Sequence, residues 1–333
     1  MMNQRASAIA FVLLLIAAVL VLLGVGVGST GFESVLHALD DPVALQIVWD
    51  IRLPRTLGAW VAGALLGLAG AVAQGLFRNP LADPYLLGSA SGASLGVALS
   101  LVLFGVSPFA TQWLMRLGLT AGAFAGAVAG VLLTLALAKG VQHTLRLLLA
   151  GVIVGVVLGA VKELIMLARP DFLQSMQSFM LGSTGYVGWT ACSIMLGTWL
   201  LCMAVAWALS PVLDGLALGE ATAASLGLPL ARLRRGLVAV LALATGTAVA
   251  QTGLVAFVGL AAPHLVRSVV KTSHGRLILM SSLMGGALLM AADILARWVI
   301  APQELPVGVL TAVLGGGYLL WLMHRRVMAK GVL

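Results

Sequence analysis

The stretch that decides the fold reads Arg52-Leu-Pro-Arg55, then an uncharged apolar run to Phe77, then Arg78-Asn-Pro-Leu-Ala-Asp-Pro84. The apolar run is long enough to cross a bilayer, because about 20 such residues form a helical span. Its two ends are polar and unlike each other. A lipid anchor needs neither paired arginines at one end nor paired prolines at the other, so we expect each end to serve a different membrane face.

Composition predicts a membrane protein throughout. Of the 333 residues, 61% are hydrophobic and 9% are charged, whereas soluble proteins carry about 25% charged residues. We therefore predict an all-α polytopic membrane protein with a single domain over residues 1–333. Its 40 glycines favour close helix–helix packing. The net charge of +8 lies in short loops, where cytoplasmic retention explains it, so we expect no nucleic acid partner.

Hydrophobic runs predict about ten transmembrane helices. The first run is too long for a signal-peptide core and is expected to stay as a span. The eighth is short and begins around Pro263, which favours a broken or tilted helix. The predicted spans cover residues 8–28, 56–77, 86–104, 112–137, 146–168, 189–210, 235–254, 256–270, 277–299 and 306–323.

The lysines and arginines predict the orientation. With the N-terminus in the cytoplasm, most of the 19 basic residues fall on the inner side, as the positive-inside rule requires. An even number of spans then places both termini in the cytoplasm. The arginines left on the outer side need a reason, and they are Arg52, Arg55, Arg116, Arg169 and Arg297.

A short repeat indicates two related halves. Ala71-Val-Ala-Gln74 recurs as Ala248-Val-Ala-Gln251, and each copy follows an arginine-rich segment. If the second and seventh spans correspond, the odd offset reverses the chain direction, which gives an inverted repeat of the kind common in transporters. The halves would cover roughly residues 1–170 and 189–333. Coincidence in a chain rich in alanine and valine is the alternative.

The outer arginines have two interpretations. They can extend from helix ends to the membrane interface, or they can dock an acidic partner, because a planar guanidinium pairs with carboxylates in a bidentate manner. Asp293 precedes Arg297 by one helical turn and can orient it. We expect the docking residues to be Arg52, Arg55 and Arg297.

Other polar residues are candidates for a pathway or gate. The corner from Asn79 to Pro84 contains two prolines, and Asp83 can cap the third span. This corner is either a rigid gate or an ordinary helix hairpin. The polar segment 169–189 could line an outer vestibule or place aromatic residues at the interface. The pathway candidates are Gln74, Asn79, Pro80, Asp83, Met176, Tyr186 and Gln251.

The longest inner loop, about residues 210–235, contains a predicted short helix. Residues 221–226 are good helix formers, Glu220 favours a helix N-terminus, and Gly227 suits a C-cap. A solvated loop is the alternative. A short helix without a membrane-burying stripe is better suited to contacting another protein.

The sequence contains no pattern of catalytic or metal-binding residues. It lacks GxxxxGK[ST], its five histidines form no HExxH motif, and its two cysteines lie in one apolar span. We expect no catalytic residue, no metal site, no cofactor bound by this chain and no enzyme activity. The alternative function is an ion-coupled secondary transporter working without an ATPase. Such carriers use ionisable residues within the membrane as relays, and Lys162, Glu163 and Asp293 are the few that the spans contain, so the sequence supports this alternative poorly.

Together these segments resemble the FecCD family, the permease subunits of ATP-binding-cassette (ABC) importers for iron chelates and vitamin B12. The resemblance covers essentially the whole chain. The matching stretches are RLPRTLGAWVAGALLGLAGAVAQGLFRNPLADPYLLGSASGASLG (52–96), LGEATAASLGLPLARLRR (218–235), TGLVAFVGLAAPHLVR (252–267) and ADILARWVIAPQELPVGVLTAVLGG (292–316).

The resemblance implies a homodimeric permease of the bacterial inner membrane that works by alternating access, with its pathway along the dimer interface. It implies a soluble binding protein whose glutamates meet the three docking arginines. It also implies two ATPase subunits that bind ATP and magnesium and contact the inner loop. The implied coupling residues are Gly219, Glu220, Ala221, Ser225 and Gly227. The substrate would be a ferric siderophore, haem or cobalamin, ranked in that order.

Overall fold

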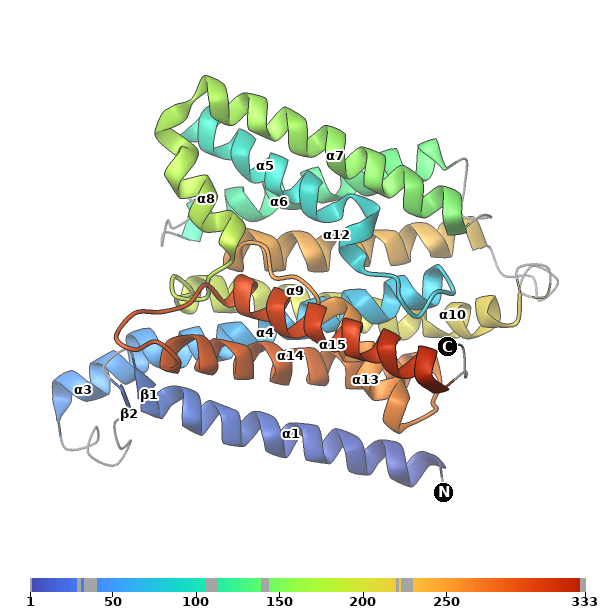
Figure 1. Cartoon of the computed structure of the whole chain (residues 1–333), viewed down its shortest axis with the longest axis horizontal. Coiled ribbons are helices and arrows are strands. Elements are labelled where there is room, and N and C mark those ends of the chain that lie inside the picture. Colours follow the sequence, from blue (N-terminus) through green and yellow to red (C-terminus); the bar gives the residue numbers. More distant parts are fainter. Residues whose placement is uncertain are drawn as a thin grey trace.

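The computed structural model describes residues 2–28, 31–32, 41–105, 113–138, 144–219, 222 and 230–329. In these ranges the chain is a bundle of helices that run side by side in both directions (Figure 1). The strands within them are two residues each, β1 (Val27–Gly28) and β2 (Gly31–Phe32), which form an antiparallel pair. The prediction of an all-α fold is confirmed.

Ten of the helices coincide with the ten predicted spans. They are α1 (Met2–Gly26), α4 (Leu53–Leu76), α5 (Ser89–Phe104), α6 (Trp113–Leu137), α7 (Thr144–Ala168), α9 (Trp189–Ala208), α12 (Leu230–Thr252), α13 (Val258–Val269), α14 (His274–Trp298) and α15 (Val307–Ala329). In the described part of the chain, seven helical runs are long and apolar enough to cross a membrane. The eighth span, α13, has only 12 residues, and Pro263 lies inside it rather than at its start.

Shorter helices connect the spans. α3 (Pro42–Ile47) continues through a single π-helical turn, η1 (Val48–Arg52), into α4, so residues 42–76 form one helical run of 35 residues. Figure 1 shows α3 extending beyond the ends of the neighbouring helices. The remaining short helices are η2 (Pro84–Leu87), η3 (Pro170–Phe172), α8 (Leu173–Leu181) and α10 (Ser210–Ala217).

Helix α4 lies in the middle of the bundle, and nearly all of its side chains are buried. It approaches α14 so closely that a Cβ atom on Gly67 would lie 2.1 Å from the carbonyl oxygen of Ser281. Between α5 and α6, a Cβ on Gly126 would lie 2.0 Å from the carbonyl oxygen of Gly92. Lipid supplies no hydrophobic drive between helices, so such close backbone packing has to hold them together.

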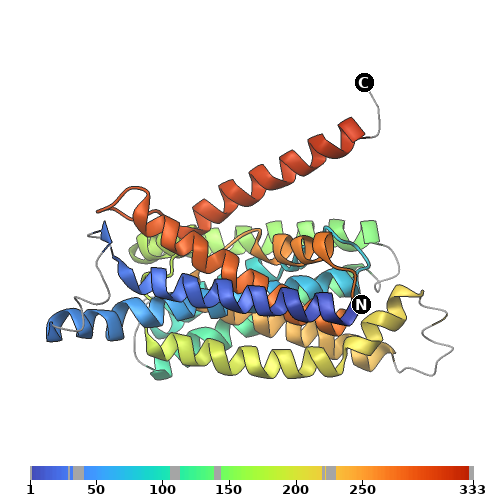
Figure 2. The ribbon, with the colours of Figure 1, turned by 90° about the horizontal axis from the view of Figure 1, so that it is seen from below.

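Two ends of the bundle can be distinguished in Figure 1. The start of α1 and the end of α15 lie at one end, here called the terminal end, and α3 lies at the other, the α3 end. Helices α4 and α12 run in opposite directions, which agrees with the inverted repeat; the repeat itself stays a prediction. Figure 2 shows α15 rising out of the bundle at an angle to the other helices.

Replacing Gly67 with alanine should lower the midpoint of thermal unfolding of the detergent-solubilised protein. The added methyl group meets backbone atoms of α14, and such overpacking costs about 1–3 kcal/mol. Gly197→Ala is the matched control, because a Cβ there meets nothing within 4 Å. A Gly67→Ala protein as stable as the Gly197→Ala protein would contradict the close approach of α4 and α14.

Candidate functional site

Four charged side chains converge at the α3 end and form what we call the arginine cluster: Arg55, Asp293, Arg297 and Glu304. Arg55 Nη2 lies 3.1 Å from Asp293 Oδ1, and Arg297 Nη2 lies 2.6 Å from Asp293 Oδ2. Arg55 Nη1 also lies 2.9 Å from Glu304 Oε2. Asp293 therefore gives one oxygen to each arginine, while Glu304 pairs with Arg55.

The cluster is tied to the first span and to the loop before α9. Arg297 donates from Nη1 to the carbonyl oxygens of Gly24, at 2.9 Å, and Val27, at 3.1 Å. The hydroxyl of Thr184, in the segment between α8 and α9, donates to Asp293 Oδ1. A buried charge is costly unless it is paired and hydrogen-bonded. These bonds join α1, α4, α14 and the α8–α9 segment at one point.

The structure brings the three predicted docking arginines to the α3 end but buries them. The exposed fraction is 9% for Arg52 and Arg55 and 2% for Arg297. Arg52 donates to the carbonyl oxygen of Val25 in α1, at 3.4 Å. Asp293 orients Arg297 across one helical turn, as predicted. The three arginines thus hold helices together, and their docking role stays a prediction.

The two repeated glutamines tie helices together. Gln74 donates to the carbonyl oxygen of Leu260, at 3.3 Å, and accepts a hydrogen bond from Arg267, so it joins α4 to α13. Gln251 donates to Thr120 Oγ1 at 2.6 Å and joins α12 to α6. Both glutamines are buried. Each glutamine therefore holds two helices together, and a pathway role for either stays a prediction.

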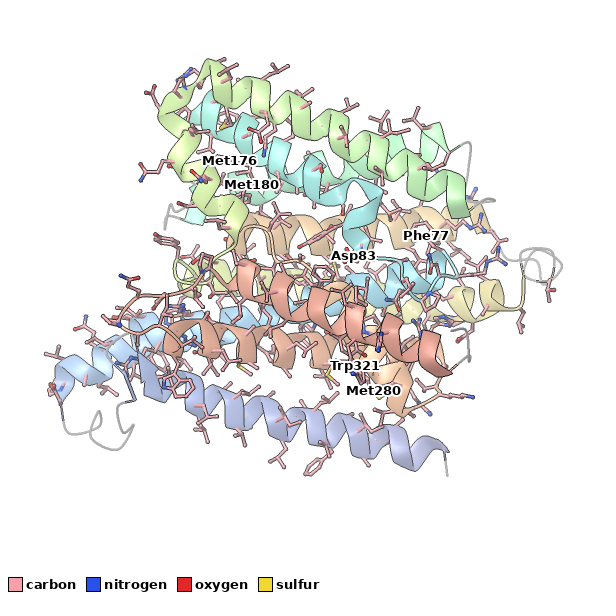
Figure 3. The ribbon with its side chains drawn as sticks, viewed as in Figure 1. Phe77, Asp83, Met176, Met180, Met280 and Trp321 are labelled. Carbon is pink, nitrogen blue, oxygen red and sulfur yellow. The ribbon has the colours of Figure 1, made fainter. Side chains whose placement is uncertain are left out.

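The polar segment 169–189 contributes one exposed and one buried pathway candidate. Met176 is 2% exposed and packs in the core beneath α8, where Figure 3 shows it close to Met180. Tyr186 is 53% exposed and lines a small pocket together with Gln251. Met176 is thus part of the core and Tyr186 is exposed, and a role of either side chain in the pathway stays a prediction.

The corner from Asn79 to Pro84 folds back on itself. Asn79 Oδ1 accepts from the amide of Leu81 at 2.9 Å. Asp83 Oδ1 accepts from the amide of Tyr85 at 2.7 Å, which caps η2 and not the third span. Helix α5 begins only after Gly88. The left-handed backbone conformation of this glycine, with a φ of 77°, ends η2 before α5 starts. Asp83 lies among the helices in Figure 3, and Pro80 is exposed. A gating role for this corner stays a prediction.

At the terminal end, α10 is anchored to the start of α14. Asp214 Oδ1 accepts from the amide of His274 at 3.0 Å and lies 2.7 Å from its Nδ1. Helix α10 leads into the predicted coupling segment, of which Gly219 is described. The predicted coupling residues Glu220, Ala221, Ser225 and Gly227 lie outside the described residues. The Asp214–His274 pair could not be predicted from the sequence, because its members are 60 residues apart and no local pattern connects them.

No group of three or more histidine, cysteine, aspartate or glutamate side chains converges in the described ranges. Cys192 and Cys202 are free and buried. Besides the arginine cluster and the anchor at α10, the described bundle contains an ion pair between Lys162 and Glu163 of α7, at 2.7 Å.

Comparison with known proteins places this architecture in a family. A sequence model of the FecCD transport family matches residues 13–325. The chain belongs to the FecCD transport family. This confirms the resemblance found in the sequence, and with it a polytopic ABC permease fold.

The relatives of this FecCD permease include two curated transport subunits. The hemin transport system permease HmuU of Yersinia pestis is 38% identical over 321 residues, which cover 94% of each chain. The vitamin B12 import system permease BtuC of Escherichia coli O157:H7 is 38% identical over 288 residues, covering 85% of each.

Two solved structures share the fold. One is a metal-chelate type ABC transporter in an inward-facing conformation, with a TM-score of 0.83, 29% identity, and coverage of 96% of this chain and 99% of that one. The other is PsaBC from Streptococcus pneumoniae, with a TM-score of 0.58, 18% identity, and coverage of 84% of this chain and 93% of that one. The second likeness concerns the fold alone.

Asp293→Asn should destabilise this FecCD permease strongly. The change keeps the shape of the side chain but leaves two buried guanidinium groups sharing one partner, and breaking a buried ion pair costs about 3–5 kcal/mol. The measurement is the fraction of folded protein after heating in detergent. Asp171→Asn is the isosteric control, because it makes the same change at an exposed aspartate of η3. Equal melting of the two variants would show that Asp293 does not hold the cluster.

Proposed function

We propose that this FecCD permease imports a large organic metal chelate of the haem or cobalamin class across the inner membrane. The identity of 38% to the hemin permease HmuU over 94% of both chains carries this proposal. The sequence contains no GxxxxGK[ST] motif, so ATP and magnesium would be bound by two separate ATPase subunits. A chelate would present its organic shell to the permease and would not need metal ligands from it. A ferric siderophore is the remaining member of this substrate class.

The distribution of basic residues supports placing the terminal end in the cytoplasm. Arg78 follows the end of α4 there, and Arg267 and Arg276 lie near the adjoining ends of α13 and α14. Retention of lysine and arginine on the cytoplasmic side would explain them. The α3 end, with the arginine cluster, would then face outward, where a soluble binding protein delivers the substrate.

The angle and the exposed apolar surface of α15 support the proposal that a second copy of the chain is a partner. The helix leaves the bundle at an angle (Figure 2) and has exposed apolar residues, among them Val313, Leu320 and Trp321. An apolar pocket between α13, α14 and α15 is lined by residues such as Leu265, Leu288 and Leu314. A neighbouring permease packed against this helix would cover these side chains, and the pathway would run between the copies. The bilayer would cover the remaining apolar faces.

Uptake by proteoliposomes tests this function. Vesicles would contain the permease with its partner ATPase, and the soluble binding protein would be outside. We expect uptake of haemin or cobalamin that requires enclosed ATP and stops when the binding protein is omitted. A ferric siderophore serves as the third substrate arm.

The same vesicles distinguish the alternative function. Uptake that follows a proton or sodium gradient in the permease alone would identify an ion-coupled secondary transporter. No uptake of any of the three chelates, with an active ATPase present, would contradict the proposed substrate class.

Asp214→Asn should reduce the amount of substrate moved per ATP hydrolysed. The change weakens the anchor that joins α10, beside the proposed ATPase contact, to α14. We expect a loss of about threefold to tenfold, equivalent to about 0.7–1.4 kcal/mol, because the Asp214 side chain is 44% exposed and asparagine can still accept one hydrogen bond. ATP hydrolysis and substrate uptake are measured in the same vesicles.

A double-mutant cycle provides the control for this pair. His274→Gln should cause a similar loss, and the double variant should lose little more, because both changes break one interaction. Additive losses, or full coupling in both single variants, would show that the anchor does not transmit movement.

A further inference from the structure

The two carboxylates of the arginine cluster differ in how they are held. Asp293 lies within α14, is completely buried, and bonds to both arginines and to Thr184. Glu304 lies in the exposed segment between α14 and α15, and its side chain is 33% exposed. Within the described part of the chain, Glu304 pairs with Arg55. Asp293 is therefore a fixed part of the fold, whereas Glu304 can be displaced without opening the helix bundle.

The donors of Arg55 are divided between these two carboxylates. Its Nε and Nη2 donate to Asp293, at 3.2 and 3.1 Å, and its Nη1 donates to Glu304, at 3.0 Å. If Glu304 moved away, two arginines would share one carboxylate, and the cluster would carry a net positive charge with an unfilled N–H donor. A carboxylate from outside could satisfy both the charge and the donor.

We propose that Glu304 occupies, in the undocked permease, the position that an acidic side chain of the docking partner takes on binding. This inference rests on the proposed function, in which a soluble binding protein docks at the α3 end. Docking then exchanges one carboxylate for another at Arg55 Nη1. Because Arg55 is only 9% exposed, an acidic partner can gain this contact by replacing Glu304. Glu304 acts as an internal competitor that keeps the cluster neutral and weakens docking.

Exchange of the carboxylate at Arg55 would also change how the start of α15 is held. Glu304 is followed by Leu305, whose amide donates to the carbonyl oxygen of Ala296 at 3.0 Å, and α15 starts two residues later. Gly308, in the first turn of α15, donates to the carbonyl oxygen of Gly182 at 3.4 Å. Releasing Glu304 removes the ionic restraint on the turn that leads into α15. Docking at the cluster would thereby loosen the helix proposed to meet the second copy.

Glu304→Gln tests the competition. The variant keeps the size of the side chain and removes its charge, so the binding protein should dock about threefold to tenfold more tightly to it than to the wild type. The probe is the purified soluble binding protein of the proposed importer, and the dissociation constant is measured on permease in lipid nanodiscs at low and high ionic strength. Glu304→Ala serves as a second variant, and thermal unfolding confirms that each variant is folded.

Asp171→Asn is the matched control. It removes one negative charge from an exposed carboxylate of η3, also at the α3 end. We expect this change to alter docking by less than about twofold, because rim charges act weakly when no direct pair is formed. Tighter docking of both Glu304 variants with an unchanged Asp171→Asn protein supports the exchange.

The possible results distinguish a failure of this inference from a failure of the proposed import function. If the Glu304 variants bind the protein as tightly as the wild type does, or less tightly, the competition is overturned while the proposed import function stands. Equal tightening by Asp171→Asn would also overturn it, since general charge would then be the cause. A wild-type permease that does not bind the protein at any ionic strength would overturn both proposals.

Discussion

Asp293 divides its two carboxylate oxygens between Arg55 and Arg297, and all three side chains lie among membrane helices. A charge in such surroundings is tolerated only with a partner, because neither lipid nor a packed core can solvate it. Each buried charge therefore needs a partner, and the arginine cluster provides those partners. The bonds of the cluster hold together α1, α4, α14 and the α8–α9 segment. Arg297 adds bonds to carbonyl oxygens at the end of α1, which fixes the first span against the centre of the bundle.

Close packing between α4 and α14 connects this cluster to the other membrane face. Helix α14 begins at His274, which is held by Asp214, and its last turns contain Asp293 and Arg297. Glycines along α4 let the two backbones touch, so neither helix has room to shift independently. A movement at α10 would therefore be passed along α14 as a whole, which gives the proposed coupling a physical route across the membrane.

The sequence predicted the spans well and the contacts poorly. Long apolar runs set the positions of the helices, and the uneven distribution of basic residues marked Arg52, Arg55 and Arg297 as exceptional. Pairing across 238 or 249 residues leaves no periodic signal, so the bonds of Arg55 to Asp293 and Glu304 could not be predicted. The cap formed by Asp83 was misplaced for a local reason: a 3₁₀ turn and a left-handed glycine intervene before α5.

The long helical run from Pro42 to Leu76 sets the depth of the arginine cluster. At about 1.5 Å per residue, its 35 residues extend about 52 Å, well beyond a hydrocarbon core of about 30 Å. Arg55 lies about 20 Å along this helix from Pro42, so the cluster is recessed below the tip of α3. The projecting α3 would keep a flat acidic surface from contacting the cluster. In the proposed docking, this geometry would favour a partner whose carboxylate stands on a protruding loop or helix end, so shape as well as charge would distinguish among acidic proteins.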